Sequence, residues 1–451
     1  MSPTTHHSRR RFLMETSCGF GYLALAGLTT QEAATANPLA ARVPHFTARA
    51  KRVIFLFMDG GPSHLDTFDY KPKLNADAGR LHPNSSGRST PLQPTLWGFR
   101  QRGQSGLWMS DLFPHLARHA DDLCMINSMH TDVPNHPQAT LMMHTGEFRF
   151  ARPSMGAWVL YGLGTENQDL PGFVFMGGTP RTGGVQSYAS AFLPASYQAT
   201  ALREGERMDN LASGNVGPQR RELDLTRSMD QRLLQRQQVN PELEGVIHSM
   251  ELGFRMQSAV PRVLDLASES RQTLALYGID RAETRSFGQQ CLVARRFAEA
   301  GARFIEISNG RWDHHNSISR EMPGHCLAID QPIAGLLTDL KLRGLLDDTL
   351  VLWGGEFGRT PGKDGTDGRG HNGAGYTMWL AGGGVKGGLR FGATDDYGGR
   401  AITDKVHVHD LHATLLHLLG LDHQRLTYRY SGRNYSLTDV HDARVVREII
   451  A

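Results

Sequence analysis

Cysteine is scarce in this chain of 451 residues. Four cysteines are present, and Cys18 falls in a segment that we expect to be removed, which leaves Cys124, Cys291 and Cys326. Three widely spaced cysteines without a C-x-x-C pair do not form a disulfide framework or a thiolate zinc site. We therefore expect buried free thiols.

The chain also lacks an excess of either charge and a long apolar run. Lys plus Arg number 48 and Asp plus Glu number 45, so the net charge is +3. This balance gives no reason to expect nucleic acid or an anionic membrane as a partner. No segment reaches the ~20 consecutive apolar residues that span a bilayer. Without a dinucleotide fingerprint or a cysteine cluster, an exported redox protein is disfavoured.

The N-terminus has the pattern of a secretory signal. Three arginines, Arg9 to Arg11, precede Phe-Leu, a short apolar run covers 19–28, and Ala34-Thr35-Ala36 supplies a cleavage site. Paired arginines before Phe-Leu are typical of a twin-arginine signal. The alternative is a disordered basic tail. We expect residues 1–36 to be this signal and the protein to act in the periplasm, the cell envelope or outside the cell.

After a linker over 37–50, strand and helix patterns alternate. Strands are predicted at 53–58, 172–176, 302–308, 349–353 and 376–380, with a helix followed by a strand over 111–127. Helices are predicted at 139–143, 289–300, 329–345 and 409–419. This alternation indicates an α/β domain over 51–451, with a mostly parallel sheet and helices on both faces.

Residues 180–285 differ in composition from the rest of the domain. They are polar and charged, and apolar residues recur at helical spacing in 243–256 and 263–277. We interpret this range as a helical insertion or lid over the core.

Polar groups follow three of the predicted strands. Those that can bind a metal are Asp59, His64, Asp66, Asp313, His314, His315, Glu356 and, in a glycine-rich loop, His371. In an open parallel sheet, ligands bind beyond the carboxyl ends of the strands. Carboxylate and imidazole together suit zinc, manganese or a similar divalent ion.

Spacing selects among these groups. Asp313 and His315 lie on one face of an extended segment, because side chains alternate with a period of two, whereas His314 points the other way. A single histidine, such as His144 or His325, is more often structural. The convergence of several such groups on one sheet edge favours a metal site.

Five long motifs resemble those of an uncharacterised sulfatase-like family with twin-arginine signals, within the alkaline phosphatase superfamily. They are FMDGGPSHLDTFDYKP, WDHHN, GGEFGRTP, GRGHNGAGYTMWLAGGGVKGG and YSGRNYSLTDV. The resemblance runs from about Arg52 to near the C-terminus. It implies an alkaline-phosphatase-like sheet, and a metal-dependent hydrolase of phosphate or sulfate esters whose substrate is a small molecule or a glycan ester.

The resemblance also implies a set of ligands for one or two divalent ions, whether zinc, manganese, calcium or magnesium. The matching positions are Asp59, Asp313, His315, Glu356 and His371. Where the superfamily has Asp-His, this chain has Glu356-Phe357, so one ion lacks a ligand unless His64 or His314 supplies it.

The nucleophile departs further from the superfamily pattern. Counting back from Thr145-Gly146 by the sulfatase spacing reaches His136, and no Cys-x-Pro-x-Arg sequence occurs. A Pro-Asn-His that resembles the one in nucleotide pyrophosphatases makes Thr131 the candidate nucleophile instead. The alternative role for Thr131, weighted equally, is the N-cap of a helix. Arg359 is a candidate to grip the anionic group, or else a surface arginine.

A second interpretation therefore stays open. The missing nucleophile and the Glu-Phe replacement favour a binding or structural protein of the cell envelope that keeps the fold without turnover, since fold does not fix function.

Overall fold

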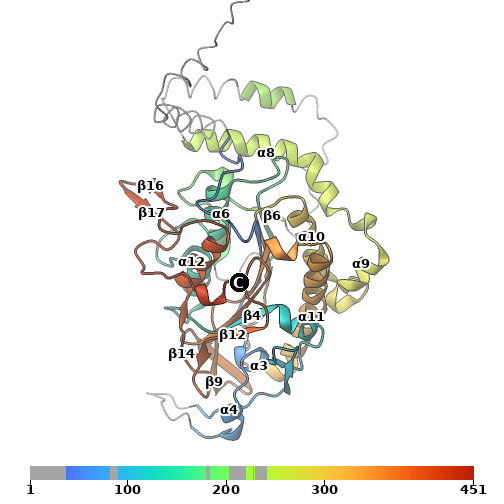
Figure 1. Cartoon of the computed structure of the whole chain (residues 1–451), viewed down its shortest axis with the longest axis vertical. Coiled ribbons are helices and arrows are strands. Elements are labelled where there is room, and N and C mark those ends of the chain that lie inside the picture. The colour runs from blue at the N-terminus through green and yellow to red at the C-terminus, as the bar shows by residue number, and fades with distance from the viewer. Residues whose placement is uncertain (1–36, 82–89, 179–182, 203–219, 227, 229–240) are drawn as a thin grey trace, which may run out of the picture.

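The structure is a computed structural model, and it describes residues 37–81, 90–178, 183–202, 220–226, 228 and 241–451 (Figure 1). The expected signal over 1–36 and its Cys18 lie outside the described residues. Within the described part of the chain, no helix is long and apolar enough to cross a membrane.

A central sheet organises the molecule. Its strands are β1 (Arg52–Met58), β4 (Leu123–His130), β5 (Phe173–Gly177), β6 (Thr200–Leu202), β7 (Phe304–Asn309), β8 (Thr349–Gly354), β11 (Tyr376–Ala381), β12 (Leu389–Phe391) and β15 (Val406–His407). They are ordered β12-β4-β11-β8-β1-β7-β5-β6, and β15 pairs with β4. Every residue of β1 is buried, as a continuous apolar run in a strand covered on both faces predicts.

One strand of this sheet runs against the others. β1 pairs with β7 and β8 in parallel, whereas β11 is antiparallel to both β8 and β4. The chain leaves β8 at the carboxyl edge and forms a hairpin there from β9 (Gly358–Asp364) and β10 (Gly368–Asn372). Because β11 therefore begins at that edge, it must run back across the sheet.

Helices cover both faces of the sheet (Figure 1). Their bounds are α5 (His136–Thr145), α6 (Met155–Leu163), α8 (Pro241–Leu264), α9 (Arg271–Leu276), α10 (Ala282–Glu299), α11 (Ile318–Leu342) and α12 (Val408–Leu418). In Figure 1, α10 and α11 pack together to the right of the sheet, and α6 and α12 lie to its left. The α/β class with a mostly parallel sheet is confirmed.

Several predicted boundaries were wrong. The helix predicted over 263–277 is broken, because α8 ends at Leu264 and two side chains restart the chain: Asp265 accepts the N–H of Ala267 and Ser270 accepts the N–H of Thr273. The segment before β4 is a 3-10 helix (Leu116–Asp122). α11 begins at Ile318, before the predicted start at 329, because Pro323 hid its first turns from the sequence pattern.

The range 180–285 is not wholly helical where it is described. Residues 200–202 form β6 and pair in parallel with β5, so they belong to the central sheet. α8, which continues through the predicted helix over 243–256, crosses the top of the molecule in Figure 1. Cys124, Cys291 and Cys326 are buried free thiols, as predicted.

Candidate metal centre

Two glycines bring the loops at the carboxyl edge into contact. Gly60, directly after Asp59, has φ +117°, and a Cβ there would lie 2.7 Å from the backbone N of Asp313 and 2.9 Å from that of Trp312. Gly61 has φ +70°, and its Cβ would lie 2.8 Å from the ring of Phe357. Only glycine adopts these conformations readily and leaves room for the neighbouring chain. The Gly-Gly pair after β1 is therefore required for the loops after β7 and β8 to meet.

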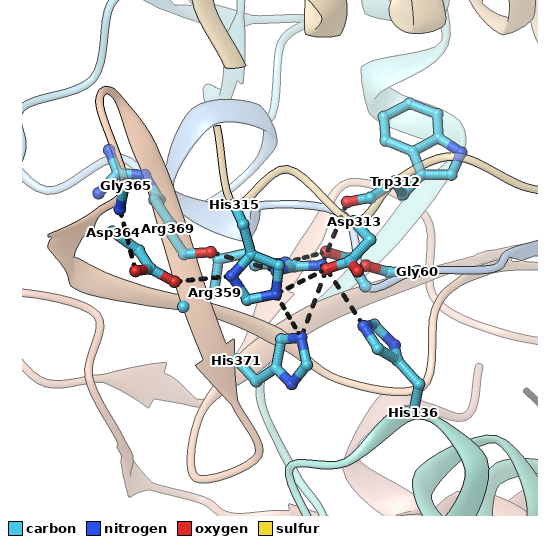
Figure 2. Close-up of polar contacts among 12 residues, drawn as sticks. Gly60, His136, Trp312, Asp313, His315, Arg359, Asp364, Gly365, Arg369 and His371 are labelled. Atoms are coloured by element: carbon cyan, nitrogen blue, oxygen red, sulfur yellow. Dashed lines mark hydrogen bonds and ion pairs between the residues drawn. The ribbon is translucent and has the colours of Figure 1, made fainter. Parts of the chain in front are cut away.

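Four side chains with metal-binding atoms meet at this edge (Figure 2). One donor atom from each of His136, Asp313, His315 and His371 lies within 4.8 Å of the others. Asp313 Oδ1 is at their centre, 3.0 Å from His315 Nε2, 3.2 Å from His136 Nε2 and 3.3 Å from His371 Nε2. The structure thus brings together three of the five predicted ligands and adds His136.

The four side chains come from three separate segments. His136 is the first residue of α5, Asp313 and His315 lie in the loop after β7, and His371 lies on β10. Asp313 and His315 both contribute to the centre, as predicted, although the backbone here turns, with the N–H groups of His314 and His315 donating to the carbonyl oxygens of Trp312 and Asp313.

Each histidine is held on its far side by a hydrogen-bond acceptor. His136 Nδ1 contacts Glu356 Oε1 at 2.5 Å, and His315 Nδ1 contacts Asp364 Oδ2 at 2.6 Å. His371 Nδ1 lies 3.0 Å from the carbonyl oxygen of Pro134. Carbonyl and carboxylate oxygens only accept, so each Nδ1 carries the proton that it donates. In the neutral form of each ring, Nε2, which faces Asp313, is then the atom that carries the lone pair; in the charged form Nε2 carries a second proton and can donate it to Asp313.

With neutral rings, the centre has more acceptors than donors. His315 Nε2 and His371 Nε2 face each other at 2.8 Å, and both face the oxygen of Asp313. Arg359 Nη2 donates to the same oxygen at 2.6 Å. Lone pairs that converge in this way need a positive species between them, either extra protons or a metal ion. A set of three imidazoles and one carboxylate fits zinc, manganese or a similar divalent ion.

The same contacts control the ionisation of the centre. Burial favours the neutral imidazole of His136, but its contacts with Asp313 and Glu356 outweigh burial and raise its pKa to about 9. Without metal this ring is therefore charged at neutral pH, and a metal ion would have to displace its Nε2 proton. Burial likewise raises the pKa of Asp313, but hydrogen bonds from His136, His371 and Arg359 outweigh it and hold this pKa well below its usual value. Asp313 is therefore a carboxylate throughout the physiological range, as a ligand must be.

The centre opens to solvent on one side. The exposed fraction of the side chain is 45% for Asp313, 38% for His315, 24% for His371 and 11% for His136. A ligand from solution can therefore reach the centre without a change in the fold.

Two predicted ligands are not among the four. Glu356 is fully buried, and its Oε1 contacts His136 on the side of the ring that faces away from Asp313. It accepts the N–H of Gly60 at 3.1 Å as well. Asp59 ends β1 as predicted, but it is buried beside Gly60 and is not grouped with the four donors.

Arg359 does not serve as the predicted grip for an anion, and it is not a surface arginine. Its side chain is 1% exposed. The guanidinium donates to the backbone carbonyl oxygens of Gly60, Gly61, Trp312 and Arg369 as well as to Asp313. Because each of its three nitrogens donates to these groups, Arg359 fixes three loops and orients Asp313.

His64 and His314, the two residues considered as the missing ligand, do not reach the centre. His64 is buried, and its Nε2 lies 2.9 Å from the carbonyl oxygen of Gly398. His314 is buried, and its Nε2 lies 3.0 Å from His325 Nδ1, while burial and the neighbouring imidazole lower its pKa to about 4. Asp66 forms a buried ion pair with Arg369 at 2.7 Å. These three residues hold the loops together and do not join the centre.

Thr131 is not the N-cap of a helix. α5 begins five residues later, with Asn135 in the N-cap position, and the backbone N–H of Thr131 donates to Gly373 at 2.8 Å. Its hydroxyl is buried and has no hydrogen-bond partner among the described residues. His136, in contrast, lies at the start of α5, where the sulfatase spacing predicts the nucleophile.

The sequence did not indicate that Asp364 contacts a ligand histidine, or that His136 is one of the four residues of the centre. Asp364 lies 49 positions from His315, at the end of β9 before a Gly-rich turn. The Asp364-Gly365 pair is a turn signal that predicts a hairpin. Only the folded hairpin brings this carboxylate to the imidazole.

Comparisons with known proteins agree with the motifs. The profile of a family described as proteins of unknown function, DUF1501, matches residues 50–450. No curated protein matches the chain.

Solved structures similar to this chain include three hydrolases. A sulfatase from Pseudoalteromonas sp. is 12% identical, with 95% of this chain and 77% of that chain covered and a TM-score of 0.38. A phosphonate monoester hydrolase from Silicibacter pomeroyi is 11% identical, with 88% and 76% covered and a TM-score of 0.40. A TAB5 alkaline phosphatase mutant with bound Mg is 10% identical, with 83% and 99% covered and a TM-score of 0.39. Because the family profile matches residues 50–450, the chain belongs to the DUF1501 family.

Proposed function

We propose that this protein is a metal-dependent hydrolase of phosphate or sulfate esters. The observation that carries the proposal is the convergence of three imidazole Nε2 atoms and the carboxylate of Asp313 on one solvent-accessible point at the carboxyl edge of the sheet. His136, Asp313, His315 and His371 are the residues that would hold the ion. A bound divalent ion supplies a Lewis acid that polarises the ester oxygen.

The chain's own groups favour an anionic substrate beside the centre. His136 is the first residue of α5, so the N-terminus of this helix lies at the centre, and Asn135 makes no side-chain cap bond to it. Unpaired N–H groups and the helix dipole at such an end attract negative charge. The sulfate or phosphate group of an ester would therefore orient toward α5.

The attacking group in this proposal is water. Both ring nitrogens of His136 face carboxylates, so this residue is occupied although it lies in the expected position of the nucleophile. Thr131 lies before α5 and is buried, so it is not proposed as the nucleophile.

The test is elemental analysis of protein purified without chelator, followed by assays on phosphate monoesters, phosphate diesters and sulfate esters. We expect bound divalent metal, hydrolysis of at least one ester class, and loss of hydrolysis in EDTA that the same metal restores. Asp367→Asn is a suitable control, because Asp367 contacts Ser319 and not a ligand of the centre. Hydrolysis that survives complete removal of metal would overturn the proposal.

A binding protein without turnover is the second candidate. Phe357, which replaces the superfamily histidine, is buried and packs its ring 4.7 Å from that of His136 and 4.8 Å from that of His371. The carbon surface of this ring adds no ligand to the site. A protein that binds metal and an anionic ligand tightly but hydrolyses none of the esters would favour this candidate.

We also propose that the protein acts outside the cytoplasm, on the strength of the Arg-Arg-Arg-Phe-Leu sequence near its N-terminus. Replacing Arg9, Arg10 and Arg11 by lysine should retain the protein in the cytoplasm, as fractionation would show. Export of that variant would contradict the prediction.

A further inference from the structure

Glu356 and His136 are held in a fixed relation. Both Glu356 oxygens accept the N–H of Gly60, at 3.1 and 3.2 Å, and Oε1 also accepts the Nδ1 proton of His136. Nδ1 and Nε2 lie on different sides of the imidazole ring. Because the ring stands between them, Glu356 cannot reach an ion that His136 Nε2 contacts. The buried carboxylate thus acts on the centre only through His136.

His315 has an equivalent partner in Asp364. Asp364 Oδ2 contacts His315 Nδ1 at 2.6 Å, and its Oδ1 accepts the N–H of Gly365 at 2.9 Å. Figure 2 shows the result, with Asp364 on one side of the His315 ring and Asp313 on the other. His371 has the carbonyl oxygen of Pro134 in the same role.

The space next to Glu356 is filled by carbon. Phe357 is 1% exposed and packs against the rings of both His136 and His371. Glu356 is therefore unsuited to serve a second ion, because it is engaged with His136 and Gly60. Among the described residues, the four side chains of the centre are the one group of three or more that could hold an ion.

We infer that the centre binds one divalent ion and not two, through Nε2 of His136, His315 and His371 and through Asp313. In this arrangement the residue in the expected nucleophile position is a metal ligand. Glu356 and Asp364 are positioning residues that hold the ligand histidines by Nδ1. The inference rests on the metal ion of the proposed function, but it does not depend on ester hydrolysis.

The role of the two carboxylates follows from hydrogen bonding. A carboxylate that accepts the Nδ1 proton fixes the tautomer and the ring orientation, and it makes Nε2 a stronger donor to a metal. Removal of such a partner lowers metal affinity by about 10- to 100-fold. Loss of a ligand should cost more.

The experiment is titration of metal-free full-length mature protein with Zn²⁺ and with Co²⁺, followed by calorimetry and by the visible absorption of the Co²⁺ form. We expect one equivalent per chain. Asp364→Asn and Glu356→Gln should keep that stoichiometry with about 10- to 100-fold lower affinity. His315→Ala should weaken binding further and change the Co²⁺ absorption, because one nitrogen ligand is lost.

Asp367→Asn is the matched control. Asp367 lies on the same hairpin turn as Asp364, but it contacts Ser319 instead of a ligand histidine. Its replacement should leave metal affinity unchanged. His315 and Asp364 are both partly exposed, so their variants should fold even if the buried Glu356 variant does not, and thermal unfolding would verify this.

Each outcome has a distinct meaning. Two equivalents per chain, or an Asp364→Asn variant with unchanged affinity, would overturn the inference and leave the proposed function standing. One equivalent with no ester hydrolysed would overturn the proposed function alone. No metal bound at all would overturn both.

Discussion

The two ends of α5 both contact histidines, but these histidines differ in their partners. At the N-terminal end, His136 faces the carboxylates of Asp313 and Glu356. At the C-terminal end, His409 and His412 from α12 donate from Nε2 to the carbonyl oxygens of Gly146, at 2.8 Å, and Met143, at 2.7 Å. These bonds satisfy carbonyl groups that a helix leaves unpaired at its end.

The ionisation of the two groups follows from their partners. Two carboxylates raise the pKa of His136 to about 9 against the effect of burial. Burial lowers the pKa of His409 to about 4 and that of His412 to about 3, because a backbone carbonyl does not compensate for lost hydration of the charge. The imidazole at the N-terminal end of α5 is thus a candidate metal ligand, and the two imidazoles from α12 at its C-terminal end are neutral structural donors.

The largest expected effect is the loss of metal affinity when Asp313, the carboxylate shared by His136, His315 and His371, is replaced. Asp313→Ala should lower metal affinity by more than the ~100-fold expected for an outer partner, because a ligand is lost. Calorimetric titration of the metal-free protein measures it. Asp132→Ala is the control, since this carboxylate contacts His407 at 3.3 Å and not the centre. Equal loss of affinity in both variants would remove the distinction between the two groups.

The contact between loops should be nearly as sensitive. Gly60→Ala requires a positive φ and places Cβ 2.7 Å from the backbone of Asp313. We expect it to lower the free energy of unfolding by about 1–3 kcal/mol and to weaken metal binding, because Asp313 must move. A Cβ on Gly310 would meet nothing within 4 Å. Gly310→Ala should change stability by only about 0.5 kcal/mol, and urea unfolding of both variants would reveal a failure of this contrast.

His409 and His412, at the C-terminal end of α5, predict that the fold loses stability in acid. The folded pKa of His412, about 3, lies below its usual value, so the unfolded chain binds more protons as the pH falls from about 6.5. The stability that neutral His412 contributes is therefore complete above that pH and is lost as the pH falls toward 3, at up to about 1.4 kcal/mol per pH unit.

His412→Leu should flatten this loss. At pH 7 it should also lower the free energy of unfolding by about 1–2 kcal/mol, because the Met143 carbonyl loses its donor. Urea unfolding of metal-free wild type and variant from pH 7 to pH 4 provides the comparison. Metal affinity at pH 7 should not change, and a loss of affinity would show that the two ends of α5 are coupled.

The smallest effect is expected at Thr131. Thr131→Val replaces a buried hydroxyl that has no partner in the described structure, so we expect stability to change by less than about 1 kcal/mol. Hydrolysis should persist on whichever ester the screen identifies. A loss of kcat with an unchanged unfolding temperature would restore Thr131 as the nucleophile.

Much of the fold was predictable from local pattern. The apolar run of β1, the helix α5 with Gly146 at its C-cap and the strands β7 and β8 were all recognised, because their burial follows from a period that the sequence displays. The reversed direction of β11 was not predicted, since it depends on where the hairpin before it lies. Helix boundaries failed where Asp265 and Ser270 restart the chain.

The centre was predictable only in part. Asp313 and His315 were expected on one face by alternation, and His371 followed from the family resemblance, so these three were identified correctly as neighbours. Arg359 was misassigned, because the sequence does not show that four backbone carbonyl oxygens surround its guanidinium.

The sequence by itself determined the class of sheet, the edge where polar groups gather and the type of ligand available there. Only the tertiary structure decided which groups face one another: that His136 joins Asp313, that Glu356 and Asp364 stand behind imidazoles, and that Phe357 fills the adjacent space. The physical reason is that periodicity specifies burial along one segment. The partner of an imidazole, and with it the charge and the role of that imidazole, depends on contacts between segments far apart in the chain.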